Sequence, residues 1–114
     1  MEQLTIEDII AINKKVGEKG VIINKGNLEF TINKANKKDD LIKEAAIILH
    51  DLVNAHAFLD GNKRTAFVSA VTFIEINGKK FNINDNDALD LVYGIANGKY
   101  NIFKVEDIVR KCVE

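Results

Sequence analysis

The segment from Leu41 to Ile76 reads LIKEAAIILHDLVNAHAFLDGNKRTAFVSAVTFIEI, and it sets the architecture of the chain. Apolar residues recur at helical spacing on both sides of a polar loop, which predicts two long helices. The first should end at or near His56, and the second should begin around Asn62 or Lys63. Because the second helix carries apolar residues on more than one face, we expect it to be the central and most buried helix.

Turn and capping residues divide the rest of the chain into further elements. Thr5 can cap a helix that stops near Gly17 to Gly20. Val21 to Ile32 has β-branched, alternating character around Lys25-Gly26-Asn27, which predicts a hairpin or an extended flap. The remaining predicted features are a helix cap at Asp39 and Asp40, a left-handed helix end at Asn77-Gly78, a polar connector over residues 79–84, a helix capped by Asp85 or Asn86 that ends at Asn97-Gly98, and a last helix from about Lys104. The expected fold is all-α, a small helical bundle with a short extended flap.

The composition is that of an ordinary globular protein. The chain has 114 residues, a hydrophobic fraction of 46% and a charged fraction of 29%, so we expect one domain over residues 1–114. The formal net charge of −1 argues against a protein that binds nucleic acid directly. No apolar run approaches the ~20 residues of a membrane span, and a lone Cys112 cannot form an internal disulfide. These features predict a cytoplasmic protein without membrane contact.

The loop between the two long helices carries the groups needed to move a phosphate-containing group to a hydroxyl. His56 can accept the hydroxyl proton because histidine titrates near neutral pH. Asp60 can hold a divalent cation through hard oxygen ligands. Gly61 and Asn62 let the backbone turn its N–H groups toward an anion, and Lys63 and Arg64 add positive charge at the start of a helix.

Each of these residues also has an ordinary structural explanation. A histidine at a helix end can be a cap, an Asp before a helix can be an N-cap, and a Lys-Arg pair can be solvated. The occurrence of all of them within nine residues favours the functional interpretation. Phe58 is best explained as a buried anchor that shapes the loop. His50 lacks the helical spacing of a metal pair with His56, so we interpret it as structural or as a surface residue.

The string His56-Ala57-Phe58-Leu59-Asp60-Gly61-Asn62-Lys63-Arg64-Thr65-Ala66 resembles the signature of the Fic/Doc family, H-P-F-x-[DE]-G-N-[GK]-R. It is most similar to the Doc (death-on-curing) branch, in which Asn-Lys-Arg-Thr-Ala replaces the Fic ending Asn-Gly-Arg-x-x-Arg. Three positions depart from the Fic pattern: Ala57 replaces a common Pro, Lys63 replaces a Gly, and Phe67 stands where Fic enzymes have a second Arg. The missing Arg weakens the case for a nucleotide bound in the orientation of AMP transfer.

The resemblance implies a toxin that transfers the γ-phosphate of ATP to a hydroxyl of a translation factor, such as elongation factor Tu or its counterpart. His56 would be the base, Asp60 the Mg²⁺ ligand, and Gly61, Asn62, Lys63 and Arg64 the phosphate site. Val21 to Ile32 would correspond to the flap that docks the target peptide as an added strand. No inhibitory-helix motif is found, which implies restraint by a separate Phd-like antitoxin. Two alternatives stay open, namely AMP transfer to a protein hydroxyl and an inactive domain that only binds a partner protein.

Overall fold

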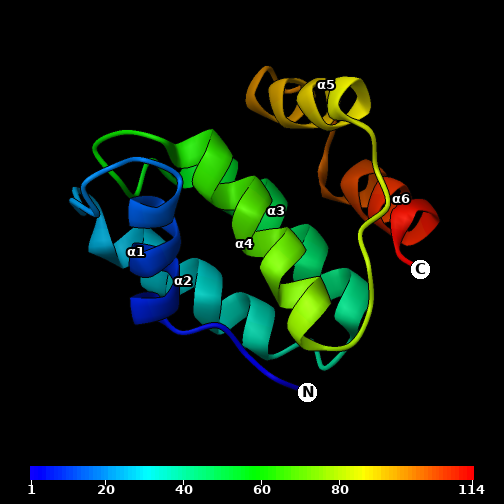
Figure 1. Ribbon diagram of the computed structural model, residues 1–114, viewed down its shortest axis with the longest axis horizontal. Helices are drawn as coiled ribbons and strands as arrows, with labels where there is room; N and C mark the ends of the chain where they lie inside the picture. Colours follow the sequence, from blue (N-terminus) through cyan, green and yellow to red (C-terminus); the bar gives the residue numbers. More distant parts are fainter.

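The computed structural model describes residues 1–114 as six α-helices joined by short connections, with no β-sheet (Figure 1). The all-α fold predicted from the sequence is therefore confirmed. One hydrophobic core of 24 buried residues draws on all six helices. None of the helices combines the length and the apolar character needed to cross a lipid bilayer. The helices are α1 (Ile6–Lys15), α2 (Lys25–Asn36), α3 (Leu41–Ala55), α4 (Asn62–Ile76), α5 (Asp85–Ala96) and α6 (Ile102–Cys112).

The central helix is α3, and the expectation that α4 is the most buried helix is wrong. Helix α3 packs against α2, α4, α5 and α6, whereas the main neighbours of α4 are α3 and α1 (Figure 1). All residues from Glu44 to Leu49 are buried, so α3 is covered around nearly its whole circumference. On α4 the apolar Val68 and Val71 are only half-buried and Ile76 is exposed. Its extra apolar face therefore lies at the surface of the bundle.

The segment Val21 to Ile32 is mostly helical, which corrects the predicted flap. Only residues 21–24 are extended, and α2 begins at Lys25 under a cap in which the Asn24 side chain accepts a hydrogen bond from the Asn27 N–H. The buried residues of α2 are Leu28, Thr31, Ile32 and Ala35, at the spacing of one helix face. Packing of this face against α3 outweighs the β-branched character that favoured a strand.

The remaining predicted boundaries are confirmed or shift by a few residues. Thr5 and Asp40 cap α1 and α3 as expected, and Gly78 follows α4 with φ +83°. The last two helices begin earlier than predicted, because Asn84 and Asn101 are their caps. The connector over residues 79–84 contains one isolated β-bridge, in which Phe81 pairs in antiparallel orientation with Val113 near the C-terminus.

Glu44 is a buried carboxylate with no cationic partner. Its side chain is fully buried in the first turn of α3, and the Gln3 Nε2 donates to Oε1 at 3.1 Å and to Oε2 at 3.4 Å. Burial raises the pKa of this carboxyl above its ordinary value, although the hydrogen bond from Gln3 acts in the opposite direction. The folded protein therefore favours the protonated form of Glu44 more than the unfolded chain does.

This raised pKa predicts a stability change with pH. The stabilisation from protonated Glu44 is present below its unfolded pKa and is lost as the pH rises through the folded value. The contribution of Glu44 to the stability of the wild-type protein should therefore be smaller at pH 7 than at pH 4. We expect Glu44→Gln to raise the free energy of unfolding at pH 7 by about 1 kcal/mol, the scale of buried polar groups. Urea unfolding at both pH values measures this, with the exposed Glu75→Gln as control. An unchanged pH dependence in Glu44→Gln would contradict the assignment.

Candidate active site

The predicted catalytic loop joins the end of α3 to the start of α4. Helix α3 ends at His56, which has left-handed backbone angles of φ 49° and ψ 42° and so turns the chain sharply. Phe58 is buried as predicted and fixes the loop to the core. The Asn62 side chain closes the loop, because its Oδ1 accepts from the Phe58 N–H at 3.0 Å and its Nδ2 donates to the Phe58 carbonyl at 2.9 Å. The loop therefore has a defined shape set by its own residues.

The start of α4 is the one helix N-terminus without a side-chain cap. The other five helices are capped by Thr5, Asn24, Asp40, Asn84 and Asn101, each accepting from an N–H three residues on.

At α4 the N-cap is Gly61, with φ 76°, and no side chain caps the helix there. The N–H groups of Asn62, Lys63 and Arg64 have no acceptor within the protein. Unpaired N–H groups and the positive end of the helix dipole favour an anion at this position.

The extended residues 21–24 pair with the loop. Ile22 forms an antiparallel bridge with Phe58, the Ile23 N–H donates to the Ala57 carbonyl at 2.8 Å, and the Leu59 N–H donates to the Val21 carbonyl at 2.9 Å. The side chains of Val21, Ile23 and Leu59 are exposed around this pairing. A short apolar edge thus borders the loop, at the position where the sequence predicted a longer flap.

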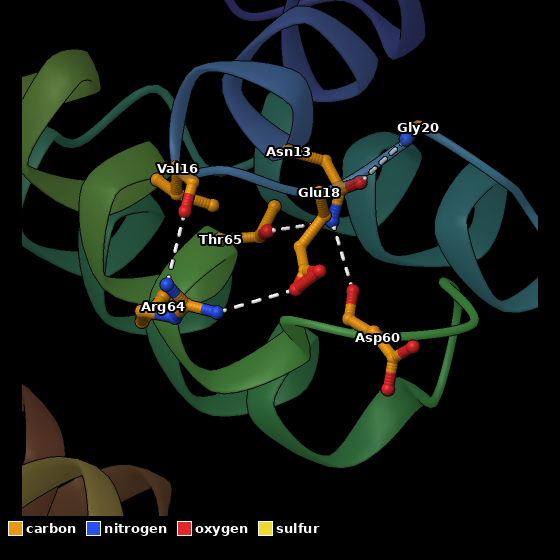
Figure 2. Close-up of polar contacts among 7 residues, drawn as sticks. All are labelled: Asn13, Val16, Glu18, Gly20, Asp60, Arg64 and Thr65. Carbon is orange, nitrogen blue, oxygen red and sulfur yellow. Dashed lines mark hydrogen bonds and ion pairs between the residues drawn. The ribbon is translucent and has the colours of Figure 1, made fainter.

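Asn13 in α1 connects three segments around the loop, and sequence reasoning missed it (Figure 2). Its side chain is 1% exposed. The Nδ2 donates to the Asp60 carbonyl and to the Thr65 Oγ1, both at 3.0 Å, and the Oδ1 accepts from the Gly20 N–H at 2.8 Å. The only signal in the sequence was an amide next to Ile12, at a position where α1 faces the core.

Arg64 reaches back to the segment that follows α1 (Figure 2). Its Nη1 donates to the Val16 carbonyl at 2.9 Å, and its Nη2 forms an ion pair with the Glu18 Oε2 at 3.2 Å. The Glu18 side chain lies over Gly61, because a Cβ built on that glycine would be 2.5 Å from the Glu18 Cγ. Glu18 accepts from the Arg64 side chain but from no backbone N–H in the first turn of α4, so the three N–H groups stay available.

The structure brings the predicted site residues to one end of the bundle. His56 is exposed and its imidazole makes no hydrogen bond within the protein. The Asp60 carboxylate is likewise exposed and has no partner. Lys63 is exposed, with its Nζ 5.8 Å from the centre of the Tyr93 ring. Since the Asn62 side chain is used within the loop, only its backbone N–H remains for an anion.

A mainly apolar groove adjoins the cationic residues of the loop. It has a volume of about 170 Å³ and lies between α4 and α5. Phe67, at the position of the second Arg in Fic enzymes, lines it together with Val92 and Tyr93. Lys63 and Arg64 form the end of the groove nearest to the start of α4.

Comparison with known proteins agrees with this arrangement. The sequence profile of the Fic/DOC family matches residues 3–74, which cover α1 to nearly the end of α4 and include the whole loop. The chain therefore belongs to the Fic/DOC family.

Two relatives place the chain in the Doc branch of that family. It is 27% identical to "Protein kinase doc" of Escherichia phage P1, over 97% of this chain and 95% of that protein. It is 54% identical to "Toxin Doc" of Mycolicibacterium smegmatis over 35 residues, which are 31% of this chain and 27% of that protein. The first similarity extends beyond α4 and includes α5 and α6.

Proposed function

We propose that this protein is a Doc-like toxin that transfers the γ-phosphate of ATP to a hydroxyl of a protein substrate. The observation that carries the proposal is the uncapped start of α4, with three free N–H groups, directly after the loop that carries the exposed His56 and Asp60. Every other helix of the chain caps its own N-terminus with a side chain. The name of the phage relative, a protein kinase, supports transfer of phosphate.

In the proposed reaction, His56 accepts the proton of the attacking hydroxyl. The hydroxyl oxygen forms a bond to the γ-phosphorus, the bond from that phosphorus to the β-phosphate oxygen breaks, and ADP leaves. The N–H groups at the start of α4 bind the phosphate oxygens. Lys63 and Arg64 add positive charge beside these oxygens, which carry the negative charge of the transferring phosphate. Catalysis of this kind depends on positioning and electrostatics more than on covalent chemistry.

Asp60 fits the role of a magnesium ligand. Its carboxylate is exposed and has no hydrogen-bond partner. Mg²⁺ in phosphate-transferring proteins commonly takes one or two carboxylates and completes its shell with phosphates and water. A bound Mg²⁺ would supply neutralisation of the phosphate charge next to the α4 N-terminus.

The proposed substrate is a translation factor, such as elongation factor Tu or its counterpart, and the proposed regulator is a Phd-like antitoxin. A protein of this activity would act in the cytoplasm, where translation takes place. The exposed apolar edge formed by Val21, Ile23 and Leu59 offers a surface beside His56 for a substrate segment. Because α2 begins at Lys25, only residues 21–24 remain for the strand addition that the family resemblance implied.

The fate of the label in ATP tests this proposal against its alternatives. Elongation factor Tu is incubated with the protein and Mg-ATP labelled at either the α or the γ phosphate. We expect label on the factor from γ-labelled ATP alone, with mass spectrometry showing the added mass of one phosphate. Transfer of α label would identify AMP transfer instead. If neither label appears on elongation factor Tu, the proposed transfer to this factor is wrong.

A further inference from the structure

We infer that Asn13 is a positioning residue for the metal-binding loop, because its side-chain amide holds the backbone of Asp60 and thereby sets where the Asp60 carboxylate lies (Figure 2). The inference rests on the proposed function, in which Asp60 is the Mg²⁺ ligand. It assigns a role in that site to a residue of α1, outside the loop motif. Asn13 itself is buried and does not reach the reacting groups.

The amide of Asn13 is fully used and therefore fixed in orientation. Its two N–H groups are directed to the Asp60 carbonyl and the Thr65 hydroxyl, and its oxygen accepts from Gly20. The backbone carbonyl of Asn13 also accepts from the Glu18 N–H at 3.1 Å. A side chain at this position must supply two donors and one acceptor in a buried space, which an Asn can do and an Asp or Ala cannot.

Asp60 depends on this contact more than its neighbours do. The bond from Asn13 is the only hydrogen bond that Asp60 makes, whereas Phe58 is held by the Asn62 side chain and by burial. Gly61, which follows Asp60, has φ 76° and has no side chain that could hold the loop backbone in place. Without Asn13, the Asp60 carboxylate would have to be ordered each time a metal binds, and that entropic cost lowers the affinity.

The test separates the metal-dependent part of nucleotide binding from the rest. Fluorescence anisotropy measures the affinity for a fluorescent, non-hydrolysable ATP analogue in Mg²⁺ and in EDTA, and the ratio of the two affinities reports the metal contribution. The variants are Asn13→Ala and Asn13→Asp. Thr65→Val is the matched control, because it removes the other acceptor of the Asn13 amide and leaves the bond to Asp60 intact.

We expect both Asn13 variants to reduce the affinity ratio by about 10-fold or more, the usual effect of losing a residue that orients a metal ligand. Their affinity in EDTA should match wild type, and Thr65→Val should keep the wild-type ratio. If an Asn13 variant is unfolded by circular dichroism, the titration is repeated for all proteins in trimethylamine N-oxide, which favours the compact state.

Two results would overturn the inference while leaving the proposed function in place. The first is a wild-type ratio in both Asn13 variants, and the second is an equal loss in Thr65→Val, which would indicate general support of the core. A wild-type protein whose affinity for the analogue is the same in Mg²⁺ and EDTA would instead refute the assignment of Asp60, and the role of Asn13 with it.

Discussion

Replacing His56 with Ala should lower the rate of phosphate transfer by about 10²–10⁴-fold, the usual effect of removing a general base. The side chain is exposed and makes no hydrogen bond within the protein, so its loss should not disturb the fold. Because His56 has a left-handed backbone conformation, His56→Asn is a useful second variant. Asn tolerates that conformation well, so it removes the base without adding backbone strain.

The rate of γ-label transfer to elongation factor Tu measures this effect, and thermal unfolding verifies that the variants are folded. His50→Ala is the control for loss of a histidine, since the His50 Nδ1 lies 2.7 Å from the Asp51 Oδ1 on the partly buried side of α3. We expect this control to transfer phosphate at the wild-type rate. Wild-type transfer by His56→Ala would remove His56 from the mechanism.

Replacing Gly61 with Ala should weaken the binding of Mg-ATP by at least about 10-fold, or ~1.4 kcal/mol. The new Cβ would be 2.5 Å from the Glu18 Cγ and 3.3 Å from its Cδ, so the Glu18 side chain would have to move. A φ of 76° also strains any residue with a side chain by roughly 1 kcal/mol. The methyl group would lie at the N-cap of α4, where the phosphate is proposed to bind.

Gly78→Ala is the matched control for backbone strain. Gly78 follows the other end of α4 with φ 83°, and a Cβ there would meet no atom within 4 Å. Both variants should lose stability, with the greater loss in Gly61→Ala, while only Gly61→Ala should lose affinity for the fluorescent ATP analogue. An equal effect of the two substitutions on affinity would show that the start of α4 does not bind the nucleotide.

The sequence was sufficient to predict most helices because their ends are marked by short-range chemistry. Thr5 and Asp40 each cap a helix by accepting a hydrogen bond from an N–H three residues on, so the signal is local. The α2 segment has the same kind of cap at Asn24, but other residues in it pointed away from a helix. Its buried face, from Leu28 to Ala35, has helical spacing, but Gly26 and several β-branched residues suggested a turn between strands. Packing against α3 decided the outcome.

The loop motif was visible in the sequence, but its supporting contacts were not. Asn13 lies 47 residues before Asp60, and Glu18 lies 46 residues before Arg64. No pattern in a single sequence indicates that such distant residues meet. The dual use of Asn62 was also hidden, because a turn residue that binds its own loop looks the same in sequence as one that binds a ligand. Composition and spacing can thus propose the reacting groups, while tertiary structure shows which of them are already engaged.

The contacts of Arg64 set a condition on any ligand of the site. Because the guanidinium already has a carboxylate partner in Glu18 and a carbonyl partner in Val16, an incoming anion exchanges with an internal competitor. The Arg64 side chain is 64% exposed and the Glu18 side chain 23% exposed, so the pair is partly open to water and contributes on the scale of surface ion pairs, about 0–1 kcal/mol. Under the proposed function, nucleotide binding would therefore include release of Arg64 from Glu18, which would loosen the contact between the segment after α1 and the start of α4.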